Sequence, residues 1–138
     1  MSFVKRFSPN TPYEEIRREA RLQRVAAGMG LAPRITRCTK TAIVMENLNA
    51  PSLAEVYGDD PEDVPLWIRD DILDILYTLY TVAEIEYIDV TPYNFIERDG
   101  VVWIIDFGHA QRRSGDIDPY LDEIFANWSI TKWNSEFA

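Results

Sequence analysis

The stretch Asp89-Val-Thr-Pro-Tyr-Asn94, followed by Ile105-Asp-Phe-Gly108, decides how the rest of this 138-residue sequence is interpreted. The first segment carries a carboxylate and a carboxamide, and the second carries another carboxylate directly after an apolar run. Oxygen groups of this kind are typical ligands of Mg²⁺. The step of twelve residues from Asn94 to Asp106 suits a tight hairpin that brings both side chains to one end, with Gly108 permitting a sharp turn. We therefore expect the three oxygen-bearing side chains to meet at one site.

The segments around these stretches predict paired strands behind a long helix. Residues 94–97 and 101–105 flank Arg98-Asp-Gly100, and an Asp-Gly pair between apolar runs predicts a β-hairpin. Apolar residues recur at three- and four-residue steps from Leu66 to Glu86, which predicts an amphipathic helix as the central pillar of the core. A last helix is expected from Asp118 to Trp128.

The first third of the chain predicts a small unit of strands and one helix. Residues 3–7 alternate apolar and basic side chains, as a short strand does, and residues 13–27 have helical spacing. Residues 34–38 and 41–46 flank a two-residue link and indicate a second hairpin. Residues 51–57 predict one or two helical turns before an acidic loop.

Composition and charge narrow the classes of function. The 23 acidic and 14 basic side chains leave a net charge of −9, which disfavours unaided binding to nucleic acid or an anionic membrane and favours a cationic partner. A single cysteine, Cys38, excludes an internal disulfide and a multi-cysteine zinc site. Because there is no secretory signal pattern and no long apolar run, we expect a cytoplasmic or nuclear location. The length and the 46% apolar composition predict one domain over residues 1–138.

Together these motifs resemble the protein-kinase superfamily over the segment from about Leu66 to Gln111. The closest likeness is to the small atypical kinase of the KEOPS tRNA-modification complex, with the RIO kinases more distant. That family has threonine where most kinases have lysine in the catalytic loop, as at Thr91 here. Residues 16–22, followed by Pro33, are similar to its glutamate-bearing helix, and Asp118-Pro-Tyr-Leu-Asp-Glu123 looks like its last helix.

The resemblance implies an α+β fold of the minimal protein-kinase type. Residues 1–46 would form a reduced N-lobe of about three strands and one helix. Residues 47–138 would form a compact, mainly helical C-lobe. ATP and Mg²⁺ would be the cofactors.

The resemblance also implies roles for individual residues. Asp89 would orient the acceptor hydroxyl, and Asn94 and Asp106 would act with it in catalysis while holding Mg²⁺ and the nucleotide. Lys5 would contact the phosphates of ATP, with Glu19 as its partner on the helix.

Some of these assignments have open alternatives. A lysine beside an arginine on an edge strand is often only a solvated charge, which is the alternative for Lys5. Glu14 or Glu15 could equally face inward as the helix partner. The segment Met45-Glu-Asn-Leu48 resembles the kinase hinge, where backbone groups near Glu46 would hold the adenine. The simpler interpretation of that segment is the end of a strand.

The sequence also departs from the kinase pattern. Because Lys5 lies so near the start, we expect the two strands and the glycine-rich loop that normally cover the phosphates to be missing, and no G-x-G-x-x-G occurs in the sequence. Tyr87 replaces the usual histidine of the catalytic loop, and Ile88 replaces the usual arginine or glycine. His109, the single histidine, follows the second motif and could act in acid–base chemistry, but a lone surface histidine is the commoner case and no role is assigned to it.

Two functions from different classes follow. The first is a small ATP- and Mg²⁺-dependent phosphotransferase, of the Ser/Thr protein kinase or ATPase type. The second is a catalytically weak pseudokinase that acts as a regulatory or kinase-mimicking binding module. In both cases we expect a nucleotide ligand, and a protein partner or a second copy of the chain to complete the N-lobe, because an incomplete sheet has an open edge. Direct nucleic-acid binding and membrane contact are not expected.

Overall fold

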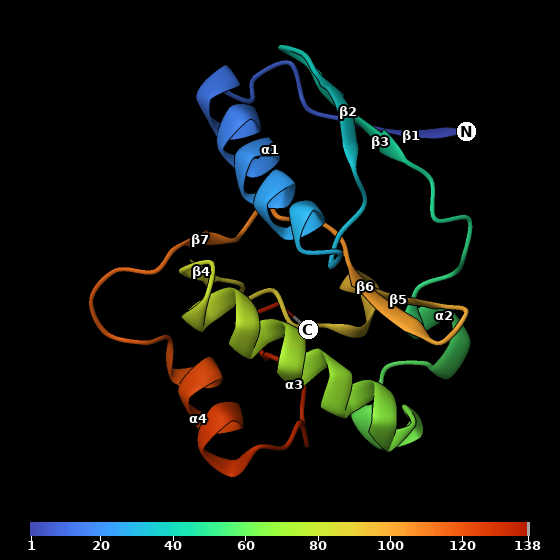
Figure 1. Ribbon diagram of the computed structural model, residues 1–138, viewed down its shortest axis with the longest axis vertical. Coiled ribbons are helices and arrows are strands. Elements are labelled where there is room, and N and C mark those ends of the chain that lie inside the picture. The colour runs from blue at the N-terminus through green and yellow to red at the C-terminus, as the bar shows by residue number, and fades with distance from the viewer. Residues whose placement is uncertain (138) are drawn as a thin grey trace.

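The structure is a computed structural model that describes residues 1–137, and it has an upper and a lower lobe in Figure 1. The upper lobe contains β1 (Ser2–Arg6), α1 (Tyr13–Gly28), β2 (Ile35–Cys38) and β3 (Ala42–Glu46). The lower lobe contains α2 (Leu53–Tyr57), the 3₁₀ helix η1 (Pro61–Asp63), α3 (Leu66–Thr81), β4 (Ile85–Glu86), the 3₁₀ helix η2 (Pro92–Asn94), β5 (Phe95–Arg98), β6 (Val101–Ile104), β7 (Gln111–Arg112) and α4 (Pro119–Asn127). This confirms the predicted α+β fold with three strands and one helix in a reduced first lobe.

The upper lobe is an antiparallel sheet with α1 packed on one face (Figure 1). The strand order is β1-β3-β2, so β3 is central. Ile16 and Ala20 of α1 pack on Ile43 and Met45 of β3 to form a small core. Lys5 lies directly opposite Ile43 in the register of β1 and β3. Because opposite residues share a face of the sheet, the side chain of Lys5 extends toward α1.

One edge of β1 has no neighbouring strand within residues 1–137. The backbone N–H of Phe7 donates to Thr41 O at 2.9 Å, next to the end of the β1–β3 ladder. Hydrogen-bonded pairs alternate along an antiparallel ladder, so Lys5 bonds to β3 whereas Val4 and Arg6 direct their backbone groups away from it. The outer edge of β1 therefore presents free donors and acceptors.

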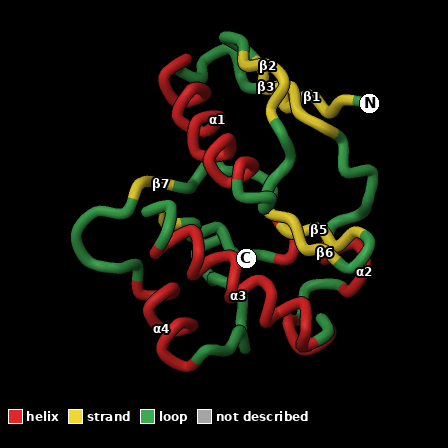
Figure 2. The backbone as a smooth tube through the Cα atoms, in the orientation of Figure 1, coloured by secondary structure: helices red, strands yellow, loops and turns green. Residues whose placement is uncertain are grey.

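Helix α3 is the pillar of the lower lobe, as predicted. Ile68, Ile72, Leu76 and Leu79 recur along one face and are at most 2% exposed. Figure 2 shows α3 running across the lower lobe, with α4 below it and the β5–β6 hairpin at its other end. The main core therefore forms around this helix.

The helix is shorter than predicted, because α3 ends at Thr81 rather than at Glu86. Glu84 has a φ of 57°, which no helical residue adopts, and Ile85 then pairs with Arg112 in the short sheet of β4 and β7. Ile85 is fully buried, so it continues the apolar spacing although it belongs to a strand. The apolar pattern alone therefore overestimated the length of the helix.

The β5–β6 hairpin forms at the predicted Asp-Gly turn. Asp99 and Gly100 have φ values of 53° and 80°, and two positive φ angles in a row are typical of the tight turns that suit twisted strands. Ile105 N donates to Asn94 O at 2.9 Å, which continues the strand pairing by one residue. The hairpin thus brings Asn94 next to the residue before Asp106.

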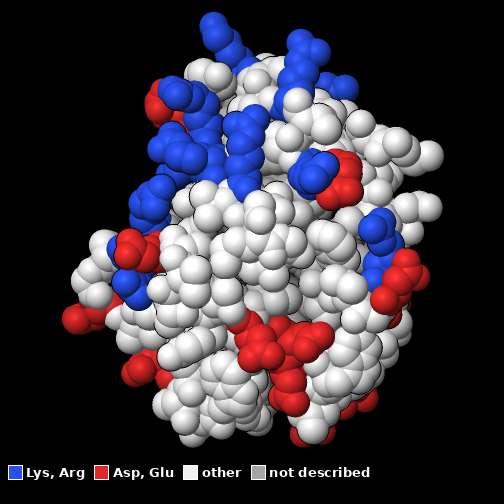
Figure 3. Space-filling model, in the orientation of Figure 1, with Lys and Arg blue, Asp and Glu red and all other residues white. Residues whose placement is uncertain are grey.

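Charge is divided unevenly between the lobes. Residues 1–46 have nine basic and four acidic side chains, whereas residues 47–138 have five basic and nineteen acidic ones. In Figure 3 basic side chains gather over the upper lobe and acidic ones lie mainly on the lower lobe. The net charge of −9 is therefore the sum of a basic lobe and an acidic lobe. Within the described residues, no helix combines the length and apolar character needed to cross a membrane.

Candidate functional site

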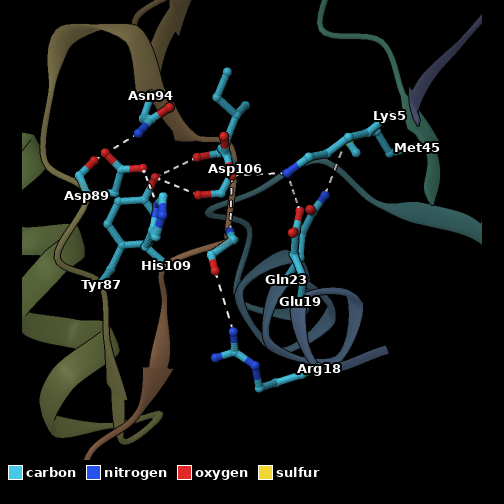
Figure 4. A network of polar contacts seen from close by, with 12 residues as sticks. Lys5, Arg18, Glu19, Gln23, Met45, Tyr87, Asp89, Asn94, Asp106 and His109 are labelled. Carbon is cyan, nitrogen blue, oxygen red and sulfur yellow. Dashed lines mark hydrogen bonds and ion pairs between the residues drawn. The ribbon is translucent and has the colours of Figure 1, made fainter. Parts of the chain in front are cut away.

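The side chain of Lys5 joins the two lobes (Figure 4). Its Nζ lies 2.5 Å from Glu19 Oε2, on α1, and 3.0 Å from Asp106 Oδ1, in the loop after β6. The side chain of Glu19 is only 5% exposed, so the ammonium compensates a buried carboxylate. Glu14 and Glu15 are both exposed. Of the three candidate glutamates, the structure therefore places Glu19 against Lys5.

These contacts shift the pKa values of Lys5 and Asp106. Burial alone would lower the pKa of Lys5, but the Glu19 and Asp106 carboxylates raise it above its usual 10.5. Burial would also raise the pKa of Asp106. The Lys5 ammonium and the Gly108 N–H, 3.0 Å from Oδ1, instead hold that pKa below 3.8. Both side chains are therefore charged at neutral pH.

Residues 105–110, between β6 and β7, are called the metal loop here after the role predicted for Asp106. The backbone turn that directs this carboxylate occurs at Asp106 itself, which has a φ of 61°. Asp tolerates this left-handed conformation better than most residues because its short side chain bonds locally, here to Gly108 N–H. Gly108 does not have a positive φ, so the expectation that it makes the turn is wrong. A Cβ at Gly108 would lie 3.1 Å from Asp106 Oδ1 and 3.3 Å from Glu19 Oε1. Glycine at position 108 therefore lets the backbone lie close to the Asp106 and Glu19 carboxylates.

Asn94 connects residues 89–94, the predicted catalytic loop, to the metal loop. Its Nδ2 donates to the backbone carbonyl of Asp89 at 2.9 Å, and its own carbonyl accepts from Ile105 N at 2.9 Å. No hydrogen bond within residues 1–137 involves Asn94 Oδ1, so this oxygen is free for a cation. Figure 4 shows Asp89, Asn94 and Asp106 gathered in one region.

Tyr87 forms a second link between the two loops, one that the sequence analysis missed. Its hydroxyl lies 2.6 Å from Ile105 O and 2.9 Å from Asp106 O, and its ring packs edge-on to Phe107 with centroids 5.2 Å apart. Complete burial, together with the nearby carboxylates, raises the pKa of Tyr87 well above 10. It is thus a neutral donor at the position where kinases usually have histidine. The only signal in the sequence was a residue with an apolar ring and a polar end beside the loop.

A cleft of about 460 Å³ opens beside this site, within the size range of small-molecule pockets. Its walls come from β1, α1, the end of β3, the segment after β3, α2, η2, β5 and the loop that carries Asp106. Glu46 lies in the wall at the predicted hinge, and its Oε1 accepts from Arg34 N at 2.9 Å. The Glu46 side chain is therefore engaged with its own lobe, and only backbone groups near it are candidates for contact with a ligand.

A model of the RIO domain matches residues 10–116, which is more than half of the chain. The chain belongs to the RIO domain family. This family comprises atypical kinases and ATPases, so the predicted kinase-like assignment is confirmed at that level. The match includes Asp89, Asn94 and Asp106, and Lys5 lies just before it. No curated protein matches the chain.

The residues present in this RIO domain fit a Mg²⁺ shared with phosphate oxygens. Residues 1–137 contain no cluster of three or more His, Cys, Asp or Glu side chains that could hold a metal. Mg²⁺ bound with a nucleotide usually takes one or two protein ligands, and phosphates and water supply the rest. Asp106, whose side chain is 43% exposed, and Asn94 Oδ1 are the groups that could bind it here.

One wall of the cleft in this RIO domain contains an unsatisfied polar atom. Gln23 is 1% exposed, and its Nε2 donates to Pro33 O at 3.0 Å and contacts Met45 Sδ at 3.4 Å. Its Oε1 is buried and has no partner among the described residues. Buried acceptors are usually paired with protein, water or ligand, so this oxygen is an uncompensated polar group in the wall of the cleft.

His109 is the second residue that the sequence analysis missed. Its Nδ1 lies 3.1 Å from Asp89 Oδ2, and its ring contacts that of Phe137 with centroids 4.8 Å apart. The side chain is 60% exposed, as expected, but it contacts the carboxylate that was predicted to be catalytic. Its position directly after Gly108 was the only signal in the sequence.

Proposed function

We propose that this RIO-domain chain is a small ATP- and Mg²⁺-dependent phosphotransferase of the Ser/Thr protein kinase or ATPase type. The observation that carries the proposal is the contact of Lys5 with both Glu19 and Asp106 at the cleft. Phosphoryl transfer needs a cation near the phosphates and acidic groups that hold a metal, and it needs little covalent help. The three side chains supply both requirements at one point.

Each residue would have a defined part in binding. Lys5, fixed between two carboxylates, would donate hydrogen bonds to phosphate oxygens. Asp106 and Asn94 would hold the metal through their side-chain oxygens. Bound Mg²⁺ would neutralise charge that develops on the phosphates. Tyr87 would hold residues 89–94 and the metal loop in fixed relative positions, because its hydroxyl donates to the Asp106 carbonyl.

Asp89 would orient the acceptor hydroxyl and receive its proton. Its side chain is 12% exposed, so the carboxylate is largely shielded and still accessible. The hydrogen bond from Asn94 to its carbonyl fixes the backbone of the loop. A general base held in this way typically contributes a factor of about 10² to 10⁴ to a rate.

Turnover tests the proposal through the substitution Asp89→Asn, which preserves shape and removes the base. We expect release of phosphate from Mg·ATP, or autophosphorylation, to fall about 100-fold or more. Asp74→Asn, an exposed residue of α3, is the matched control and should keep the wild-type rate. Equal rates in wild type and Asp89→Asn would contradict the enzyme proposal.

The free edge of β1 favours a second candidate, a catalytically weak pseudokinase that binds a partner. The outward backbone groups of Val4 and Arg6 are available to a strand from another protein or from a second copy of the chain, which would complete the N-lobe. If this is the function, the chain still binds nucleotide, and Asp89→Asn does not change the rate of phosphate release or autophosphorylation. The finer likeness to the KEOPS-complex kinase, and a place in such an assembly, remain predictions.

A further inference from the structure

The segment after α4 returns to the catalytic loop and binds on both sides of Asp89. The side-chain amide of Asn134 donates to Ile88 O at 2.8 Å, and its backbone N–H donates to Val90 O at 3.0 Å. Asn134 is 5% exposed, and the neighbouring Trp133 is buried with its Nε1 donating to Asp59 O at 2.9 Å. The C-terminal segment is therefore anchored at the residues that flank the predicted catalytic carboxylate.

Beyond this anchor, Phe137 contacts His109, and His109 in turn contacts the Asp89 carboxylate. Phe137 N donates to Asn134 O at 3.0 Å, which folds the segment back into a turn. The ring of Phe137 lies against His109 at 4.8 Å between centroids with an interplanar angle of 41°, and His109 Nδ1 lies 3.1 Å from Asp89 Oδ2. Figure 4 shows His109 beside Asp89. One oxygen of the carboxylate is thus already paired.

This pairing competes with the role proposed above for Asp89. A carboxylate that receives the proton of an acceptor must be within hydrogen-bond reach of that hydroxyl. Of the paired groups, the side chain of Asp89 is 12% exposed and that of His109 is 60% exposed, so the histidine is the group with room to move. Contact with Phe137 opposes that movement.

We infer that His109, held by Phe137, is a gate that determines which acceptor reaches Asp89. Water is small enough to approach the other carboxylate oxygen. The hydroxyl of a protein Ser or Thr side chain is attached to a bulky backbone and must displace His109 first. The gate therefore favours hydrolysis over transfer to protein until the C-terminal segment moves. The inference rests on the proposed phosphotransferase function.

The test compares two rates in the full chain supplied with Mg·ATP: release of phosphate, and transfer of phosphate to dephosphorylated casein as a probe acceptor. The variants are Phe137→Ala and His109→Ala. We expect each to raise the ratio of transfer to hydrolysis by roughly two- to tenfold, the range for loss of one competing hydrogen bond. KM for casein should fall while KM for ATP stays constant. Trp128→Ala removes another aromatic ring from the C-terminal part of the chain, one that contacts Tyr77 and Phe125, and should keep the wild-type ratio.

The possible failures are distinguishable. An unchanged or lower ratio in a folded variant that still hydrolyses ATP overturns the gate and leaves the phosphotransferase proposal standing. Wild-type rates no higher than those of Asp89→Asn overturn the proposed function and the gate with it. If Phe137→Ala unfolds, His109→Ala decides, because it removes a mostly exposed side chain and leaves the anchor at Asn134 in place.

Discussion

Lys5 forms ion pairs with two carboxylates, those of Glu19 and Asp106, whose surroundings differ. Glu19 is buried on α1, whereas nearly half of the Asp106 side chain is exposed at the cleft. A bound phosphate would therefore compete with Asp106 for the ammonium more readily than with Glu19, because the more exposed carboxylate is the easier one to solvate. The pair with Glu19 holds Lys5 in place, and the contact with Asp106 is the one that a ligand rearranges.

The lowered pKa of Asp106 predicts how its contribution to stability depends on pH. A carboxyl group with a lower pKa in the folded state stabilises that state above its unfolded pKa of 3.8, and this stability is lost as the pH falls through the folded pKa. The free energy of unfolding of wild type should therefore exceed that of Asp106→Asn at pH 6 by a small amount, under about 1 kcal/mol for so exposed a pair. Urea unfolding at pH 6 and pH 3 should show this difference shrinking in acid. A difference that grows in acid would mean that folding raises the pKa.

Gly108 gives a test of close packing at the site. In Gly108→Ala the new Cβ must displace Asp106 Oδ1 or Glu19 Oε1, so we expect a loss of about 1 kcal/mol of stability and weaker binding of Mg·ATP. Gly28→Ala is the matched control, since a Cβ at Gly28 meets no atom within 4 Å and alanine favours the helix. Thermal unfolding with and without Mg·ATP measures both effects. Identical behaviour of the two variants would show that the contact at Gly108 does not matter.

At the scale of elements, α1 is attached to the metal loop by two adjacent residues. Glu19 reaches the loop through Lys5, and Arg18 donates to Ala110 O at 2.6 Å and to Gly108 O at 3.4 Å. The helix therefore contacts the loop directly as well as through the ion pair. Its position relative to the lower lobe decides whether Glu19 can hold Lys5.

This attachment predicts that Arg18→Ala weakens both stability and nucleotide binding. Loss of charge-assisted hydrogen bonds to backbone carbonyls should lower the free energy of unfolding by about 1 kcal/mol and reduce the affinity for Mg·ATP severalfold. Arg21→Ala removes an exposed arginine from the same helix and should stay within about 0.5 kcal/mol of wild type. Chemical unfolding and calorimetric titration of both variants supply the comparison. An Arg18→Ala variant as stable and as tight-binding as Arg21→Ala would contradict it.

Local signals in the sequence were sufficient for most elements, and contacts between distant residues were not. The Asp-Gly pair fixed the β5–β6 turn because the turn depends on two neighbouring φ angles. The end of α3 was mispredicted because buried Ile85 continued the apolar spacing beyond the break at Glu84. The partners of Tyr87 and His109 lie eighteen or more residues away, and only the folded chain brings them together.

At the scale of the molecule, the site lies where a basic lobe meets an acidic one. Lys5 belongs to the lobe with an excess of five positive charges, and Asp106 belongs to the lobe with an excess of fourteen negative charges. The acidic lobe repels a free triphosphate, so a metal ion that offsets this charge should be needed for binding. The account therefore predicts that binding depends on Mg²⁺ and on Asp106 together.

The melting temperature of the chain with ATP, in the presence and absence of Mg²⁺, tests this prediction in wild type and in Asp106→Asn, with the exposed Asp70→Asn as control. A ligand at about 100 times its Kd adds roughly 2.7 kcal/mol to the stability of the state that binds it. The account predicts a rise that requires Mg²⁺, persists in Asp70→Asn and is lost in Asp106→Asn. No rise at millimolar ATP and Mg²⁺, or an equal rise in wild type and Asp106→Asn, would contradict it.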